Sequence, residues 1–229
     1  FDLAGTIADT LYSIMEAVNM CMEHYGFPQK SYSEVRAAVG NGAKMLIMNT
    51  IPETEAQNAE RAEEIYKYFK LCYDKTHAHI DGCYDGMREA MLELHARGYT
   101  LAVLSNKPDA YVKGIISSLF DEGVIPIAMG ETDLPRKPDP TAPLLIASEL
   151  GAEPWQCAFI GDSEVDIKTA QNAGMTAVVI YDESSAEYKE QFLSVSDAYV
   201  NTFSEILGLS AGKKDKNRRA SIGEAVGEF

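Results

Sequence analysis

Apolar and polar positions alternate in two different ways along this chain. From Asp9 to about Lys75 the apolar residues recur every three to four positions, which is the spacing of a helix face packed on a core. No stretch in this region has the short apolar runs that are typical of strands. The pattern predicts helices from Asp9 or Thr10 to Gly26, from Ser33 to Val39, over Met45–Met48, and from Glu55 to about Lys75.

After Gly82 the pattern changes to short apolar runs that alternate with helical stretches. The expected strands are Thr100–Ser105, Ile125–Met129, Cys157–Gly161 and Thr176–Ile180, and the expected helices are Met87–Arg97, Ala110–Leu119, Thr141–Leu150 and Glu164–Ala173. Weaker elements follow near Ala198–Val200 and Phe203–Leu207. Strands and helices in this order are typical of a parallel sheet with helices on both faces. The fold class is therefore α/β, with a Rossmann-like parallel sheet and an inserted all-helical domain.

These patterns divide the chain into three parts. Residues 1–11 and 82–209 form the sheet domain, residues 12–81 form the helical insertion, and residues 210–229 form an appended tail with a local excess of Lys and Arg. The segment Asp2–Thr6 has the composition of a strand end that enters a loop. Because a strand needs about five residues, we expect the sequence in hand to begin within its first strand.

Composition narrows the class of protein. The chain has 20 Lys and Arg against 35 Asp and Glu, a net charge of −15, so we expect neither nucleic acid nor an anionic membrane as a partner. No apolar run approaches the roughly 20 residues of a membrane span. The four cysteines form no CxxC pair, which favours free thiols in a reducing cytoplasm. These patterns do not indicate an oligomeric state.

Polar side chains gather at four expected strand ends or in the loops that follow them. Each has an ordinary alternative, because an Asp before a helix is usually a cap and a loop Lys is usually solvated. The carboxyl ends of parallel strands meet at one edge of the sheet, however, and bring such loops together. The residues are Asp2 and Thr6, Ser105 and Asn106, Lys137, and Asp162 with Asp166.

Convergent carboxylates, a lysine and hydroxyl groups suit the Mg²⁺-assisted transfer of a phosphoryl group. Mg²⁺ prefers hard oxygen ligands, and Lys and Ser or Thr donors neutralise and orient phosphate oxygens. A carboxylate can attack phosphorus to form an acyl phosphate, which water then cleaves. Rival sites are absent from the sequence, which has neither the GxxxxGK[ST] of a P-loop nor the GxSxG of a serine hydrolase.

Four motifs at these residues resemble those of the haloacid dehalogenase-like phosphatase superfamily. The similarity covers nearly everything from Phe1 to about Leu209, including the helical insertion, which is similar to the family's mobile cap. The chain most resembles the phosphoglycolate phosphatases of this superfamily. The motifs are Phe1–Ile7, similar to Asp-x-Asp-Gly-Thr-Leu/Val, then Leu104–Lys107, Lys137–Pro140 and Gly161–Ile167.

The resemblance implies a Mg²⁺-dependent phosphomonoester hydrolase that acts on a small phosphometabolite such as 2-phosphoglycolate. Asp2 would be the nucleophile and a metal ligand. The carbonyl of Ala4 and the Asp162 carboxylate would complete the protein's share of the Mg²⁺ shell, with Asp166 supporting it directly or through water. Thr6, Ser105, the Asn106 backbone and Lys137 would hold the phosphate.

Residue 4 departs from the family's pattern. The family has a second Asp there, as general acid and then general base, and this chain has Ala4. A methyl group carries no proton, so a contribution of roughly 10²–10⁴-fold to the rate is removed. Two interpretations stay open. One is an engineered or recent substitution in a phosphatase, and the other is a natural pseudo-phosphatase that binds or senses a phosphometabolite without turnover.

The segment 40–44 interrupts the helical insertion with two glycines around an Asn. Glycines let a backbone approach a ligand closely, although a plain helix–helix turn has the same composition. Lys44 follows in the first turn of the next helix, where a cation would help to hold an anionic substrate. We predict that Asn41, Gly42 and Lys44 contribute to substrate specificity.

Overall fold

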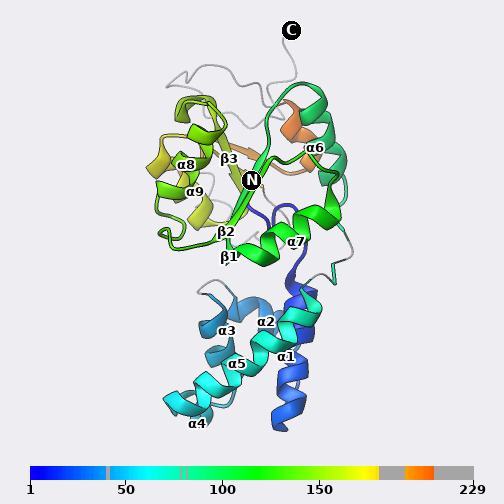
Figure 1. Cartoon of the computed structure of the whole chain (residues 1–229), viewed down its shortest axis with the longest axis vertical. Coiled ribbons are helices and arrows are strands. Elements are labelled where there is room, and N and C mark those ends of the chain that lie inside the picture. Colours follow the sequence, from blue (N-terminus) through cyan, green and yellow to red (C-terminus); the bar gives the residue numbers. More distant parts are fainter. Residues whose placement is uncertain (40–41, 78, 81, 181–193, 209–229) are drawn as a thin grey trace. The chain divides into compact units, whose positions relative to one another are not determined.

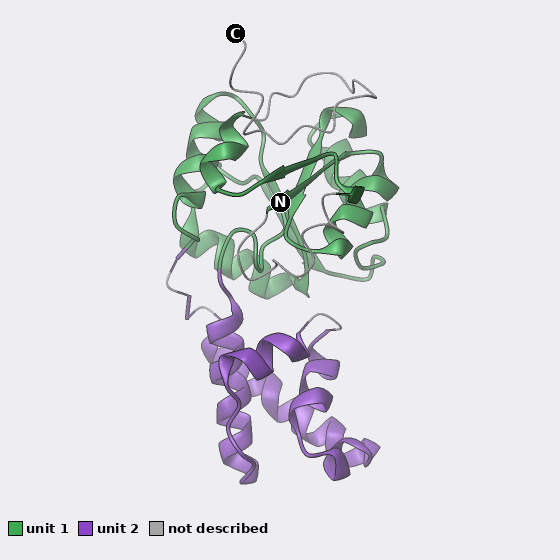
Figure 2. Ribbon diagram, turned by 180° about the vertical axis from the view of Figure 1, so that it is seen from behind, with its two compact units in different colours: residues 1–8, 83–229 green, residues 9–82 purple. Residues whose placement is uncertain are grey.

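A computed structural model of the chain describes residues 1–39, 42–77, 79–80, 82–180 and 194–208. The chain divides into two compact units, one made of Phe1–Ala8 with Cys83–Phe229 and the other of Asp9–Gly82 (Figure 2). Their limits lie within a few residues of the predicted boundaries. The predicted tail, 210–229, lies outside the described residues. None of the described helices is long and apolar enough to span a membrane.

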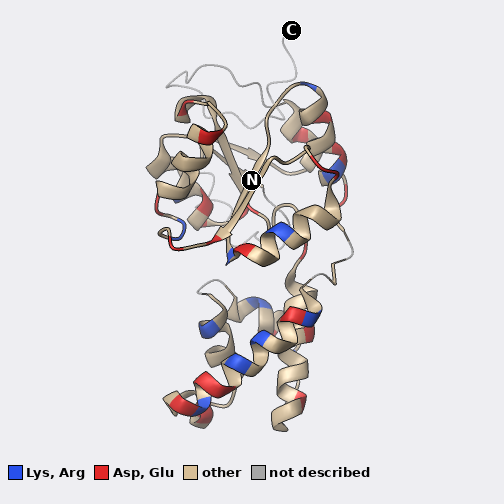
Figure 3. Cartoon of the chain, viewed as in Figure 1, with Lys and Arg blue, Asp and Glu red and all other residues tan. Residues whose placement is uncertain are grey.

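Within 9–82 the described residues form helices and no strand. The first helix, α1, begins where the Asp9 carboxylate accepts the N–H of Leu11 at 2.8 Å, and it ends at Gly26, whose φ is +69°. Charged residues of both signs follow one another along α5, whose apolar face is buried (Figure 3). The helices are α1 (Leu11–Tyr25), α2 (Tyr32–Ala38), α3 (Ala43–Thr50), α4 (Glu53–Ala56) and α5 (Ala59–Thr76).

The other unit alternates strands and helices, and this confirms the predicted α/β fold. In Figure 1, α8 and α9 lie to one side of the strands and α6 and α7 to the other. The elements are α6 (Met87–Ala96), β1 (Ala102–Pro108), α7 (Asp109–Leu119), β2 (Ile127–Glu131), α8 (Thr141–Glu149), η1 (Pro154–Gln156), β3 (Ala158–Gly161), α9 (Glu164–Ala173), β4 (Thr176–Ile180), β5 (Ala198–Val200) and η3 (Phe203–Gly208).

The first two residues of the chain join two parallel sheets, β1–β2 and β3–β4–β5. The amino group of Phe1 donates to the carbonyl of Ala102, and the carbonyl of Phe1 accepts the N–H of Leu104, both at 2.9 Å, which binds Phe1 to β1. Asp2 donates its N–H to the carbonyl of Ile160 in β3 at 2.8 Å. Residues 1–2 therefore run between β1 and β3, in the position of a central strand.

Three predicted boundaries were wrong for local reasons. The helix expected to run on from Glu55 is two helices, because Asn58 is extended and its side chain accepts the N–H of Arg61, which starts α5. Strand β2 begins two residues later than predicted, after Pro126, which has no N–H for the ladder. Strand β1 continues to Pro108 through an irregular register, so Asn106 lies in the strand and not beyond it.

The ends of β1 and β2 meet closely at Gly130. Its N–H donates to the Asp109 carboxylate at 2.9 Å. A Cβ atom on residue 130 would stand 2.4 Å from the Cα of Asp109 and 2.5 Å from the carbonyl oxygen of Lys107, where only glycine fits. This contact sets the spacing of the two strand ends at the edge of the sheet.

We expect Gly130→Ala to lower the free energy of unfolding by about 3 kcal/mol, because the atoms that a methyl group meets are backbone and have no room to move. Urea denaturation measures the change. Gly151→Ala is the control: no atom lies within 4 Å of its added Cβ, and its φ of +68° costs only about 1 kcal/mol. Equal losses in the two variants would contradict the close contact at residue 130.

Candidate active site

A buried lysine stands at the centre of the predicted site. The Lys137 ammonium donates to Oδ1 of Asp2 at 2.7 Å and to Oδ1 of Asp166 at 2.8 Å, and all three side chains are at least nine-tenths buried. Burial alone would lower the pKa of Lys137, but the two carboxylates outweigh it and raise the pKa above its ordinary value. Residues predicted from three separate motifs therefore meet in one ion-pair network.

Asp162 lies against the loop that follows Asp2. The backbone of Gly5, with φ of +86°, passes so close that a Cβ there would stand 2.2 Å from the Asp162 carboxylate. Thr6 is fully buried, and its hydroxyl donates to Oδ1 of Asp162 at 3.0 Å. In this structure the Thr6 hydroxyl therefore orients a carboxylate; the phosphate-binding role that the resemblance implies for Thr6 stays a prediction.

Both carboxylate oxygens of Asp166 already have donors. Oδ1 accepts from Lys137, and Oδ2 accepts from the N–H of Ser163 at 3.1 Å and from its hydroxyl at 2.5 Å. Ser163 and Asp166 form the capping box that starts α9. Asp166 therefore orients the lysine and starts a helix, an arrangement that favours a supporting role over direct ligation.

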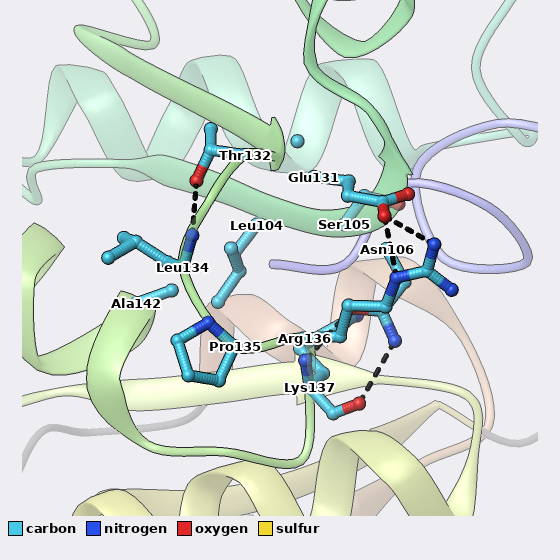
Figure 4. A pocket seen from close by; sticks show the side chains of 11 residues that line it. Leu104, Ser105, Asn106, Glu131, Thr132, Leu134, Pro135, Arg136, Lys137 and Ala142 are labelled. Atoms are coloured by element: carbon cyan, nitrogen blue, oxygen red, sulfur yellow. Dashed lines mark hydrogen bonds and ion pairs between the residues drawn. The ribbon is translucent and has the colours of Figure 1, made fainter.

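The end of β1 supplies the other predicted phosphate donors. Ser105 is buried, and its hydroxyl oxygen accepts the N–H of Lys107 at 3.4 Å, which leaves its own proton to donate. The side-chain amide of Asn106 hydrogen-bonds to the backbone carbonyl and N–H of Lys137. A small pocket of about 10 Å³ lies beside these residues and has room for one water molecule. The ion pair between Glu131 and Arg136 lines this pocket (Figure 4).

The cluster holds more negative than positive charge. Carboxylate oxygens of Asp2, Asp162 and Asp166 lie within 4.8 Å of one another. Burial, and then the carboxylates of Asp2 and Asp166, raise the pKa of Asp162 to about 7. Burial also raises the pKa of Asp2, against the effect of Lys137. Clustered hard oxygen donors with an excess of negative charge fit a small divalent cation such as Mg²⁺.

Comparison with known proteins identifies the family. Residues 1–180 match the family model of the haloacid dehalogenase-like hydrolases. This chain belongs to that family. The phosphoglycolate phosphatase of Vibrio cholerae is 33% identical over 185 residues, which cover 76% of this chain and 79% of that protein. The phosphoglycolate phosphatase of Mannheimia succiniciproducens is 29% identical over 184 residues, 78% of this chain and 82% of that protein.

Solved structures of haloacid dehalogenase-like proteins agree with this assignment. The crystal structure of a predicted phosphoglycolate phosphatase from Haemophilus somnus superposes with a TM-score of 0.78 at 27% identity, over 91% of this chain and 95% of that one. A haloacid dehalogenase-like hydrolase from Bacteroides fragilis shares the fold, with a TM-score of 0.74 at 21% identity over 90% of this chain and 97% of that one. The predicted resemblance to phosphoglycolate phosphatases is confirmed.

At residue 4 the side chain is a methyl group, and the group that could still serve as a ligand is the backbone carbonyl. The Leu3 carbonyl accepts the N–H groups of Ile7 and Ala8, and Gly5 donates to the carbonyl of Ala8. Among the described residues no backbone hydrogen bond ends on the carbonyl of Ala4. The carbonyl is therefore free of backbone donors, as the metal-ligand role implied by the family would require.

The predicted specificity residues lie in the helical unit. Gly42, with φ of +87°, precedes α3, and the Lys44 ammonium pairs with Glu63 on α5 at 2.7 Å. Asn41 lies outside the described residues. That these three residues select the substrate stays a prediction.

Sequence reasoning missed three residues around the site. Ser163 was detectable, because Ser-x-x-Asp before an apolar run is a capping-box signature. Lys107 is the last residue of a predicted motif but had no role assigned to it; burial lowers its pKa to about 8 while Asp2 opposes the shift. Asn172 contacts the Lys137 loop from α9, and no local pattern indicates such a contact.

Lys137→Met should destabilise the metal-free protein by about 3–5 kcal/mol at pH 7, because Asp2 and Asp166 would be left as buried carboxylates without their cation. Urea denaturation in EDTA measures the loss. The control, Lys168→Met, breaks an exposed pair with Glu164 on α9 and should cost less than about 1 kcal/mol. Similar losses in both variants would mean that the buried network contributes little to the fold.

Proposed function

We propose that this chain is a Mg²⁺-dependent phosphomonoester hydrolase that acts through an aspartyl-phosphate on a small phosphometabolite such as 2-phosphoglycolate. The observation that carries the proposal is the buried Asp2 carboxylate, which is held by Lys137 at 2.7 Å beside Asp162. The phosphoglycolate phosphatases among its relatives support the substrate class. The predicted cytoplasmic location belongs to the same proposal.

The proposed first half-reaction forms a covalent intermediate on Asp2. A carboxylate oxygen of Asp2 attacks phosphorus as the ester P–O bond breaks, and the leaving alkoxide takes up a proton. Ser105, the backbone of Asn106 and Lys137 bind the phosphoryl oxygens and stabilise their negative charge. Water then attacks the phosphorus of the acyl phosphate, and inorganic phosphate and the free Asp2 carboxylate are released.

Mg²⁺ would be held by the carboxylates of Asp2 and Asp162 and by the carbonyl of Ala4. When bound, Mg²⁺ supplies positive charge next to the transferring phosphoryl group. Thr6 fixes the direction of the Asp162 carboxylate, and Asp166 fixes the lysine. The helical unit 9–82 is proposed to act as the cap, whose closure excludes water, with Asn41, Gly42 and Lys44 contacting the substrate.

Ala4 limits turnover in this proposal, because no group at residue 4 gives a proton to the leaving oxygen or takes one from water. The same residue favours a second candidate function, a protein that binds or senses a phosphometabolite without hydrolysing it. The two candidates share every other site residue, so residue 4 is the position at which an experiment separates them.

We expect Ala4→Asp to raise kcat by roughly 10²–10⁴-fold on one or a few members of a phosphomonoester panel that includes 2-phosphoglycolate. Phosphate release in the presence of MgCl₂ is the measurement. Ala4→Asn introduces a side chain of the same size as Asp but without a titratable proton, so this variant should keep the parent's rate. Asp2→Asn, added to Ala4→Asp, should abolish the gain. Binding of a phosphometabolite without any gain in Ala4→Asp would favour the sensing protein.

Mg²⁺ affinity tests the metal proposal separately. Asp162→Ala should weaken Mg²⁺ binding by about 100-fold or more, since loss of an outer-shell partner alone costs 10–100-fold. Titration calorimetry of protein freed of metal with EDTA gives the dissociation constant. Glu164→Ala, which removes an exposed carboxylate two residues away, is the matched control and should bind as the parent does. Equal Mg²⁺ affinity in Asp162→Ala and the parent would show that Asp162 is not a Mg²⁺ ligand.

A further inference from the structure

One side chain forms hydrogen bonds with both the N–H and the carbonyl of Lys137. Asn106 in β1 donates from Nδ2 to the carbonyl of Lys137 at 3.0 Å, and its Oδ1 accepts the N–H of Lys137 at 2.9 Å. An amide side chain offers the same donor and acceptor as a peptide group, so Asn106 pairs with Lys137 as a neighbouring strand would. The loop after β2 is thereby bound to β1 at the one residue that carries the buried ammonium.

A second asparagine holds the next residue of the same loop. Asn172, near the end of α9, donates from Nδ2 to the carbonyl of Pro138 at 2.8 Å. The loop also closes on itself, because the N–H of Asp139 donates to the carbonyl of Arg136 at 2.9 Å. The peptide groups around Lys137 are therefore fixed from β1 on one side and from α9 on the other.

This fixation matters because a lysine side chain is long, and its ammonium has to lie within hydrogen-bond distance of two carboxylates. The ammonium must reach Asp2 and Asp166 at once, at 2.7 and 2.8 Å. Ordering a lysine side chain costs rotamer entropy, and a backbone that moves would add to that cost. The two asparagines hold the backbone of Lys137 in a position from which its ammonium meets both carboxylates.

We propose that the side-chain amides of Asn106 and Asn172 are a clamp that positions Lys137 for its contact with the nucleophile. Both are positioning residues that act through the backbone of the 137–138 segment. The effect on catalysis rests on the proposed phosphatase function, whereas the placement of the lysine does not. The clamp therefore has one test that needs no activity and one that does.

The first test measures how accessible the Lys137 ammonium is in the folded, metal-free protein. Brief acetylation followed by peptide mass spectrometry compares Lys137 with Lys168, whose side chain is 55% exposed, within one sample. In the parent, Lys137 should react far more slowly than Lys168. In Asn106→Ala and Asn172→Ala the difference should shrink several-fold, because the freed loop lets the ammonium reach solvent.

Gln171→Ala is the matched control for Asn172→Ala. Gln171 is the preceding residue of α9, is also exposed, and donates from its own amide to the carbonyl of Val195 at 2.7 Å. The control removes the same kind of bond from the same helix without touching the Lys137 loop, so Lys137 should stay protected. Asn106→Asp, which keeps the volume and the acceptor but loses the donor, replaces Asn106→Ala if that variant does not fold.

The second test uses the Ala4→Asp protein and the best substrate of the panel. Asn106→Ala or Asn172→Ala in that background should lower kcat by up to roughly 10²-fold, the effect of a misplaced catalytic group, while Gln171→Ala leaves it unchanged. Unchanged Lys137 protection in both asparagine variants would overturn the clamp. If Ala4→Asp is inactive but the asparagine variants expose Lys137, the clamp stands and the proposed function fails.

Discussion

The contact between the Lys137 ammonium and the carboxylates of Asp2 and Asp166 is the interaction on which the rest of the site depends. It joins the start of the chain, a loop and the first turn of a helix, far apart in the sequence, through side chains that are at least nine-tenths buried. Any one of the three charges would be costly to bury alone. Together they hold the sheet edge in a single arrangement, and that arrangement presents Asp2 next to Asp162.

The topology explains how so few residues form such a site. Residues 1–2 run between β1 and β3, and the polar residues that follow each strand meet at the same edge, as parallel sheets require. Rigid backbone supports each of them: Asp2 is bonded to the sheet, Asp166 starts α9, and Lys137 is tied to Asn106. These side chains are therefore held by regular structure and by hydrogen-bonded backbone.

Much of this arrangement followed from local patterns in the sequence. The βα periodicity predicted the sheet, and the motif residues at strand ends predicted the cluster of Asp2, Lys137 and Asp162. Three sets of hydrogen bonds were not predictable. They are the two bonds between the Asn106 side chain and the Lys137 backbone, the bond from the Thr6 hydroxyl to Asp162, and the bond from Asn172 to the carbonyl of Pro138. Each depends on distances between segments, and a sequence pattern reports only the spacing of residues within one segment.

Residue 4 and residue 137 place opposite constraints on how this protein can change over evolutionary time. Around residue 4 the main chains of Leu3 and Gly5 make the backbone hydrogen bonds, so a change of the residue 4 side chain alters the chemistry and removes none of these bonds. At residue 137 the same side chain holds the buried ion pairs and is proposed to bind the phosphoryl group, so we expect a substitution there to lower both stability and activity. An enzyme of this architecture thus has a short mutational path to a stable, non-hydrolysing binding protein, and that path runs through residue 4.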